Sequence, residues 1–151
     1  MTGVQTCALP ISIGLAQALS GSVAEGRKLC EEAVTIAQRK KSRSLITGAQ
    51  LALAEAMLLS KDNSAAIQTA LEAQKVFAQS GQQDSEWRAL LVAARASDLA
   101  GNKSAAHDYA SRADQVCNAL PQKWGADSYQ SYLKRPDIQT YRKQLSDLLK
   151  Q

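Results

Sequence analysis

Apolar side chains recur at steps of three and four residues along most of the chain, which is the spacing of one face of an α-helix. In the stretch 51–58 these positions are Leu51, Ala54, Met57 and Leu58. The polar run 60–64 follows, and its Ser, Asp and Asn residues are suited to end one helix and cap the next. A second apolar face, from Ala66 to Phe77, ends at Ser80-Gly81, where glycine can close a helix. The pattern therefore predicts two helices joined by a short polar turn.

This two-helix pattern recurs every 40 residues without a gap. Leu19, Leu59 and Leu99 occupy one column of the repeat. Four other columns hold small residues: Gly14, Ala54 and Ala94; Gly26, Ala66 and Ala106; Cys30, Ala70 and Ala110; and Ala33, Ala73 and Ala113. Small side chains four and seven residues apart share a helix face. We therefore expect the two helices of each pair to approach closely along this stripe.

The repeat predicts three helix pairs between residues 12 and 120. Outside the pair that flanks the 60–64 turn, the expected helices are 12–19, 22–39, 84–100 and 104–118. A pair of this kind cannot bury its apolar face alone, so stacked neighbours share one core. We expect the space between successive pairs to be filled by Leu59, Leu99, Val76 and Val116. The units are 12–40, with a truncated first helix, 41–81 and 82–120.

The segment 121–151 departs from the repeat. It holds four of the seven aromatic residues: Trp124, Tyr129, Tyr132 and Tyr141. Between Pro121 and Pro136 we expect a short helix over 124–133, and then a final helix that Asp137 caps. Its apolar face is Ile138, Tyr141, Leu145, Leu148 and Leu149. Terminal repeats are atypical because they cover the last apolar face, so these residues are interpreted as capping helices. An aromatic docking patch for a partner is the alternative.

The repeated unit resembles the tetratricopeptide repeat (TPR) over residues 12–120. The resemblance rests on the small residue in the first helix of each pair, on the glycine-containing turns at Gly21 and Gly101, and on the three small positions of each second helix. It implies an all-α, right-handed superhelical array of antiparallel helix pairs, an α-solenoid. The usual TPR unit has ~34 residues, against 40 here. HEAT and armadillo arrays, with units of ~40–47 residues, remain an alternative.

The resemblance also implies a function. TPR-like arrays bind proteins or peptides in a concave groove lined by first helices, and many are attached to larger signalling or regulatory proteins. The charged residues at matching positions are Glu55, Arg88, Arg95 and Asp98. We expect a non-catalytic interaction scaffold, the C-terminal part of a larger bacterial protein, with these residues at the partner-binding surface. The alternative is that the four charges only solvate the groove or pair with each other.

Residues 1–11 resemble the conceptual translation of a sequencing adapter, most recognisably in the stretch 4–11, VQTCALPI. On this interpretation the biological chain begins near Ser12 and its true N-terminus is missing. A secretory signal is the competing interpretation, but such signals start with a positive charge, and no Lys or Arg precedes Arg27. We therefore leave residues 1–11 out of the expected fold.

Composition supports a helical and non-enzymatic chain. Alanine, the best helix former, accounts for 26 of 151 residues, and only three are proline. No run approaches the ~18 apolar residues of a membrane span, so no membrane partner is expected. His107 is the only histidine, and Cys30 and Cys117 form no CxxC pair. We therefore expect no catalytic residues, no metal and no cofactor. Cys30, in an alanine column, is interpreted as a small buried residue, and reduced thiols favour the cytoplasm.

The net charge of +4 is concentrated most sharply in the run 39–43, Arg39-Lys40-Lys41-Ser42-Arg43. Phosphate contacts from such a run would make the chain a nucleic-acid-binding adaptor. No aromatic residue interleaves the run for base stacking, so a solvated loop is the preferred interpretation. A structural or self-association role is the other alternative to partner binding.

Overall fold

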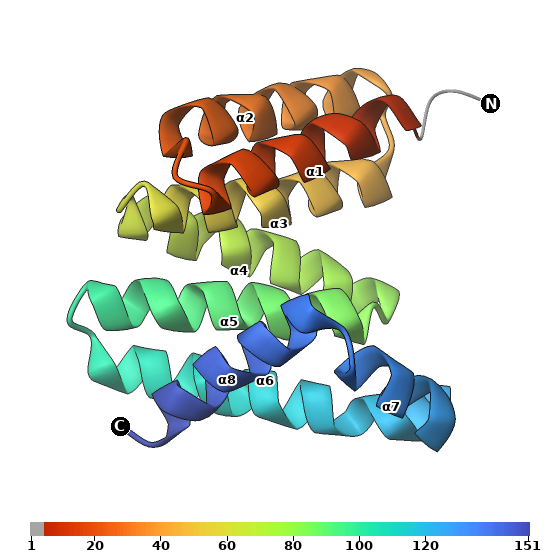
Figure 1. The fold of residues 1–151 in the computed structure, drawn as a ribbon, viewed down its shortest axis with the longest axis vertical. Helices are drawn as coiled ribbons and strands as arrows, with labels where there is room; N and C mark the ends of the chain where they lie inside the picture. Colours follow the sequence, from red (N-terminus) through yellow and green to blue (C-terminus); the bar gives the residue numbers. More distant parts are fainter. Residues whose placement is uncertain (1–4) are drawn as a thin grey trace. The chain divides into compact units, whose positions relative to one another are not determined.

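The computed structural model describes residues 5–151, with side chains from residue 10 onward, and this part of the chain is helical without any strand (Figure 1). The all-α prediction is confirmed. Residues 1–4 of the adapter-like segment lie outside the described residues. The helices are α1 (Gln5–Leu19), α2 (Val23–Arg39), α3 (Arg43–Leu59), α4 (Asn63–Ser80), α5 (Gln83–Leu99), α6 (Lys103–Trp124), α7 (Ala126–Leu133) and α8 (Pro136–Leu149).

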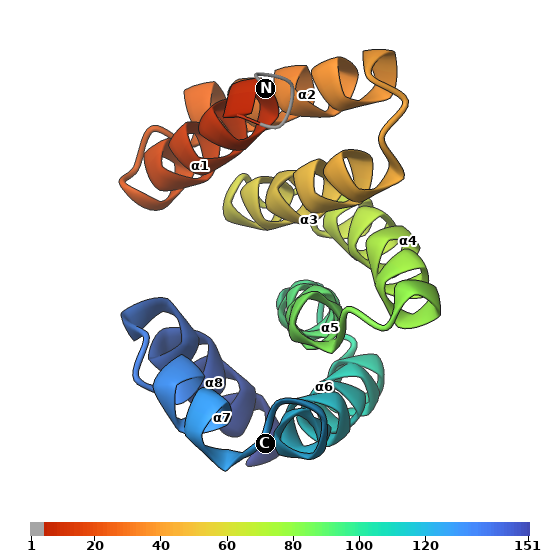
Figure 2. The same cartoon turned by 90° about the vertical axis from the view of Figure 1, so that its right-hand side faces the viewer.

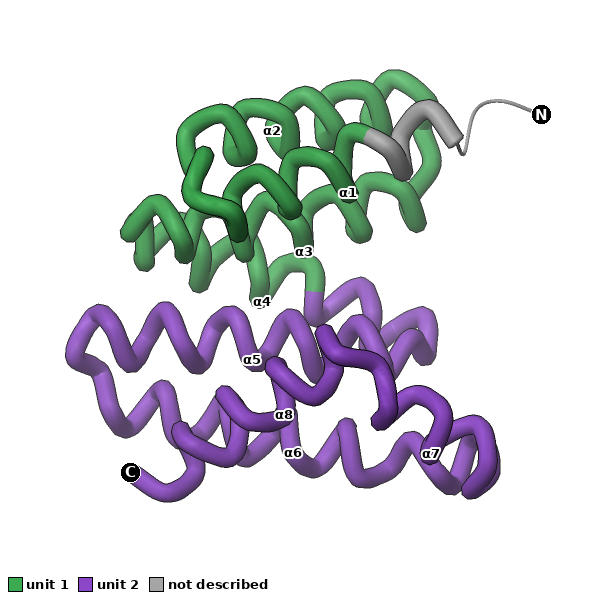
Figure 3. The backbone as a smooth tube through the Cα atoms, in the orientation of Figure 1, with its two compact units in different colours: residues 1–73 green, residues 74–151 purple. Residues whose placement is uncertain are grey.

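The chain divides into two compact units, residues 1–73 and 74–151, with the boundary inside α4 (Figure 3). In the first unit, α1 packs along α2, and α3 packs against both (Figure 2). In the second unit, α5 packs along α6, α7 packs on α6, and α8 contacts both α5 and α6. Each unit therefore consists of helices that are neighbours in the sequence.

The α1–α2 pair has the close approach that the small residues predict. A Cβ atom built on Gly26 would lie 2.5 Å from the carbonyl oxygen of Gly14 and 2.5 Å from the backbone nitrogen of Ala18. Both of these atoms belong to the backbone of α1, so no side chain can move aside to make room. Only glycine fits at position 26 at this helix separation.

The core of the first unit joins α3 to the α1–α2 pair. Ala18 and Cys30 form one buried cluster with Ala52, Leu53 and Ala56 of α3. Cys30 is fully buried, as the alanine column predicts. Leu59 packs against this cluster, but its counterpart Leu99 is 63% exposed. The expectation that Leu99 fills the space between helix pairs is therefore wrong, because the last residue of α5 faces solvent.

A polar link adds to this core. The guanidinium of Arg27, on α2, donates through Nη1 to the hydroxyl of Ser60 at 3.1 Å and pairs through Nη2 with the carboxylate of Asp62 at 3.1 Å. Its Nε also donates to Glu31 at 3.0 Å. Ser60 and Asp62 lie in the turn between α3 and α4. One side chain therefore holds this turn against α2.

Aromatic side chains build the core of the second unit. Trp87 of α5 is fully buried, and its Nε1–H donates to the hydroxyl of Tyr132, on α7, at 2.9 Å. Tyr141 of α8 meets the Trp87 ring edge-on at 6.5 Å, and Trp124 meets Tyr132 at 5.1 Å. Burial raises the pKa of Tyr132 to about 12. These rings therefore pack against one another within the unit, and Tyr132 is buried while Trp124, Tyr129 and Tyr141 are partly buried.

A second polar cluster joins α6, α7 and α8. Nη1 of Arg142 donates to the hydroxyl of Tyr129 at 2.9 Å and lies 3.3 Å from the sulfur of Cys117. Burial of the Cys117 thiol raises its pKa, and the positive charge of Arg142 opposes that rise. The cluster therefore ties one side chain from each of these three helices together.

The helix ends of the C-terminal segment differ from the prediction. Pro121 lies inside α6, which continues to Trp124. A proline near the end of a helix removes only one backbone hydrogen bond, and Leu120 and Cys117 remain buried beside it. α8 begins at Pro136 with Arg135 as the capping residue, so Asp137 is not the cap. The helix begins there because proline is favoured at the first helical position. Asp137 lies in the first turn and pairs with Arg135 at 2.6 Å.

Replacement of Gly26 by alanine tests the close approach. We expect Gly26→Ala to lower the free energy of unfolding by about 1–3 kcal/mol, since the added methyl group forces two backbones apart. Gly48→Ala, on α3, is the matched control because no atom lies within 4 Å of its added Cβ. It should stabilise the chain by about 0.5–1 kcal/mol. Urea unfolding of both variants measures the difference, and equal stability of the two would refute the close approach.

Removal of the Tyr132 hydroxyl tests the buried hydrogen bond. We expect Tyr132→Phe to cost about 1–3 kcal/mol of unfolding free energy, because the Nε1–H of Trp87 then stays buried without an acceptor. Tyr109→Phe, at a partly exposed ring on α6, should change stability by less than about 0.5 kcal/mol. Denaturant unfolding followed by Trp fluorescence compares them. A cost for Tyr132→Phe no larger than that of Tyr109→Phe would contradict this role.

Candidate functional site

The predicted partner-binding residues fall in both units. Glu55 lies on α3 in the first unit, and Arg88, Arg95 and Asp98 lie on α5 in the second. Within α5 the three residues are seven and three positions apart, which places them along one face of the helix. The structure therefore brings Arg88, Arg95 and Asp98 onto one stripe, which we call the α5 stripe.

Glu55 is buried, with 2% of its surface exposed. Its negative charge acts on the neighbouring thiol of Cys30, whose pKa rises to about 11. Burial of the thiol is the largest cause of this rise, and the charge of Glu55 is the second. The carboxylate of Glu55 thus lies inside the first unit.

The two ends of the α5 stripe make contacts within the second unit. The guanidinium carbon of Arg88 lies 5.1 Å from the centre of the Tyr141 ring of α8, a cation–π contact. At the other end, the carboxylate of Asp98 pairs with Nζ of Lys103 at 2.5 Å. Arg95 lies between them and is partly exposed.

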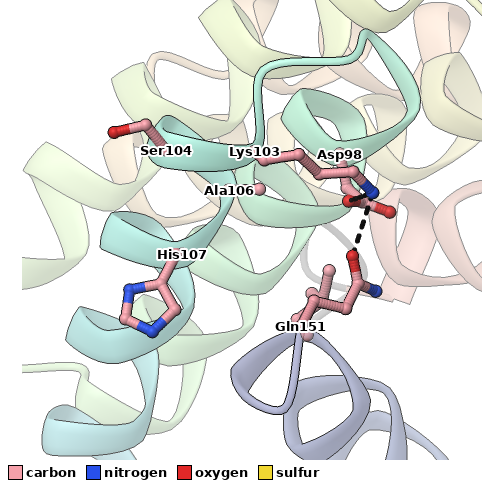
Figure 4. A pocket seen from close by; sticks show the side chains of 7 residues that line it. Asp98, Lys103, Ser104, Ala106, His107 and Gln151 are labelled. Carbon is pink, nitrogen blue, oxygen red and sulfur yellow. Dashed lines mark hydrogen bonds and ion pairs between the residues drawn. The ribbon is translucent and has the colours of Figure 1, made fainter.

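A cavity of about 520 Å³ lies beside Asp98, where the end of α5, the start of α6 and the end of α8 meet (Figure 4). Nζ of Lys103 donates one hydrogen bond to the carboxylate of Asp98 and a second, at 2.9 Å, to Oε1 of Gln151. Ser104 and His107 also line the cavity, and Figure 4 shows their side chains pointing away from this trio. The mainly apolar floor comes from Ala106 and Leu148.

The cavity combines an ion pair with an apolar floor. Lys103 and Asp98 neutralise each other, and the apolar floor suits a small aliphatic group. The part of the chain that the structure describes contains no cluster of three or more His, Cys, Asp or Glu side chains placed to hold a metal ion. In the same residues, no helix is long and apolar enough to cross a membrane.

The sequence predicts the α5 stripe, because its residues are seven and three positions apart, but it does not indicate the cavity. The Asp98–Lys103 pair spans the turn between α5 and α6, so its short sequence separation was a usable signal. Leu148 and Gln151 carry no such signal, because their place beside α6 depends on how α8 folds back. The basic run 39–43 was located correctly as a connection: it joins α2 to α3, and Arg39, Lys40, Lys41 and Arg43 are exposed.

In comparisons with known proteins, no protein-family model and no curated protein matches the sequence. The function proposed below therefore rests on the geometry of the described residues.

The thiol of Cys30 offers a test of where Glu55 lies. In a background with Cys7→Ser and Cys117→Ser, we expect Glu55→Gln to lower the pKa of Cys30 from about 11, though not to the ordinary value of 9.0, because burial remains. Glu31→Gln, the next cause in size, should lower it less. The ultraviolet absorbance of the thiolate, titrated against a Cys30→Ser reference, measures the pKa. No change in Glu55→Gln would place the carboxylate away from the thiol.

Proposed function

We propose that the chain is a TPR-like helical-repeat module that binds a protein or peptide partner and has no catalytic activity of its own. The observation that carries the proposal is the burial of small residues forty positions apart. Cys30, Ala70 and Ala110 are fully buried, as are Ala33, Ala73 and Ala113. The same environment at three equivalent places supports a repeated packing unit rather than three unrelated helix pairs.

The helix bounds support the same unit. The first helices α1, α3 and α5 end at Leu19, Leu59 and Leu99, and the second helices α2, α4 and α6 begin at Val23, Asn63 and Lys103. Each turn thus falls forty residues after the one before. We propose that the pairs stack into a right-handed superhelical array and that α7 and α8 cap it, since stacked repeats need a last element to cover their apolar face.

The proposed contact surface is the α5 stripe together with the cavity beside Asp98. Such an array has few deep pockets and binds through an extended surface. Arg95 can form a charge-assisted hydrogen bond with a carboxylate of the partner, while Arg88 and Asp98 keep the contacts that position α5. A partner with an acidic group next to a small apolar side chain fits this surface.

Nucleic-acid binding is the second candidate, and the exposure of four basic side chains around the α2–α3 connection favours it. They are Arg39, Lys40, Lys41 and Arg43. Binding through phosphate contacts alone would fall steeply as the salt concentration rises. This candidate ranks second because the basic side chains are confined to one turn and have no aromatic neighbours in the sequence for base stacking.

A peptide array tests the proposal. The full chain is incubated with immobilised random peptides, half of which carry Asp or Glu. We expect it to select acidic members, and Arg95→Glu should weaken that binding about tenfold or more, a loss of ~1.4 kcal/mol or above. Arg39→Glu makes the same charge change outside the α5 stripe and should leave binding within about twofold, roughly 0.4 kcal/mol.

Three results would count against this assignment. Equal binding by the unaltered chain and Arg95→Glu would remove the α5 stripe as the contact surface. Absence of any selected peptide would reject the interaction role. Retention of an oligonucleotide that Arg39→Glu abolishes, with steep salt dependence, would favour the nucleic-acid candidate. Circular dichroism of each variant confirms that the helices are intact.

A further inference from the structure

A second cavity, of about 390 Å³, lies where the end of α4, the start of α5 and the end of α6 meet in the second unit. The contact surface proposed above does not include it. The small residues Ala78 and Ala119 line it together with the polar residues Gln83, Glu86 and Lys123. We call it the Gln83 cavity.

The side-chain amide of Gln83 has an acceptor without a donor. Its Oε1 is buried, and no described residue donates a hydrogen bond to it. A buried acceptor that stays unpaired destabilises a protein relative to one that is paired. Because Gln83 lines the cavity, a ligand bound there is in a position to provide the missing donor.

Glu86 adds a negative acceptor to the same cavity. It lies three residues after Gln83 along α5, so the two side chains share one helix face. The carboxylate is partly buried, and its Oε1 accepts a hydrogen bond from Nε2 of Gln74 at 3.0 Å. Gln74 is uncharged, and none of the ion pairs in the described part of the chain includes Glu86. Its charge is therefore available to a cation.

A cation of the chain itself already binds at the edge of the cavity. Nζ of Lys123, near the end of α6, donates to the carbonyl oxygen of Gly81, just after the end of α4. The last carbonyl groups of a helix carry the negative end of its dipole, and both α4 and α6 end here. The start of α5 has the opposite polarity, which Asp84 and Glu86 in its first turn offset. The local field thus favours a positive group.

We propose that the Gln83 cavity binds the guanidinium of an arginine side chain from a partner protein. A guanidinium has five N–H donors in a planar fork and accepts no hydrogen bond. It can therefore donate to Oε1 of Gln83 and to the carboxylate of Glu86 together. The short side chains of Ala78 and Ala119 leave room for its methylene stem. The inference does not rest on the acidic contact proposed for the α5 stripe, and it adds a second anchor of opposite charge.

Titration of the full chain with Nα-acetyl-argininamide, followed by NMR of the backbone amides, tests the site. We expect saturable shifts at residues 81–86 and 119–123. The uncharged citrulline analogue should bind about tenfold or more weakly, because it lacks the charge that strengthens hydrogen bonds to a carboxylate. The lysine analogue should bind about threefold or more weakly, because an ammonium has no planar fork to match two acceptors.

Substitution of Glu86 has a matched control. Glu86→Gln should weaken binding of the arginine analogue about tenfold, since the negative charge is lost. Glu72 also accepts a hydrogen bond from a glutamine, Gln68, at 3.2 Å, but it is exposed and lies outside the cavity. Glu72→Gln should therefore leave the binding within about twofold.

Two substitutions of Gln83 should change binding in opposite directions. Gln83→Glu replaces the amide by a carboxylate that only accepts, and it should strengthen arginine binding about threefold or more. Gln83→Met keeps a similar shape and helix propensity but removes the buried acceptor. It should weaken binding about threefold or more and raise the urea midpoint of the unbound chain. A purely structural role of Gln83 would lower that midpoint.

Three results would overturn the site. They are equal affinity for the arginine and citrulline analogues, equal losses of arginine binding in Glu72→Gln and Glu86→Gln, and a lower urea midpoint in Gln83→Met. The third would mean that Oε1 is already paired in the unbound chain. None of them bears on the peptide array, which scores acidic peptides and Arg95. Failure of this site and failure of the α5 stripe can therefore be told apart.

Discussion

The close approach of paired helices is the constraint on which the rest of the structure depends. At Gly26 the two backbones of the α1–α2 pair come so near that even a methyl group has no room. The alanines of the later pairs are likewise fully buried. Such contacts place large residues, Leu53 for example, on the faces that pack against the neighbouring pair. The alanine-rich composition thus follows from the packing as well as from helix propensity.

The two units differ in how far their helices cover their apolar side chains. In the second unit, α8 buries Ile138, Leu145 and Leu148, and Trp87 of α5 finds its acceptor on α7. In the first unit, Ile13 of α1 is 44% exposed. The aromatic residues concentrated after residue 120 are therefore part of the closure of the second unit. The charged α5 stripe adjoins this closure, because Tyr141 lies over Arg88.

Helices and turns were predictable because their signals are local. The three- and four-residue spacing located α2, α5 and the start of α6 within one residue, and the polar turns marked the ends of α3 and α5. Asp137 was predicted to cap α8, but the capping residue is Arg135. Proline is favoured at the first helical position, and this preference outweighs a nearby aspartate. The exposure of Leu99, the burial of Glu55 and the Trp87–Tyr132 bond depend on which helices meet in space. No local pattern in the sequence encodes those meetings.

Arg27 has a consequence for cooperativity. Its guanidinium touches a residue of its own helix, Glu31, and two residues of the turn after the next helix, Ser60 and Asp62. Separation of that turn from α2 must therefore break two polar contacts together with the apolar cluster beneath them. Solenoid-like chains tend to open piecewise, one repeat at a time, to the extent that coupling between neighbours is weak. Arg27 adds to that coupling, so we expect α2 and the α3–α4 turn to open together in native-state hydrogen exchange.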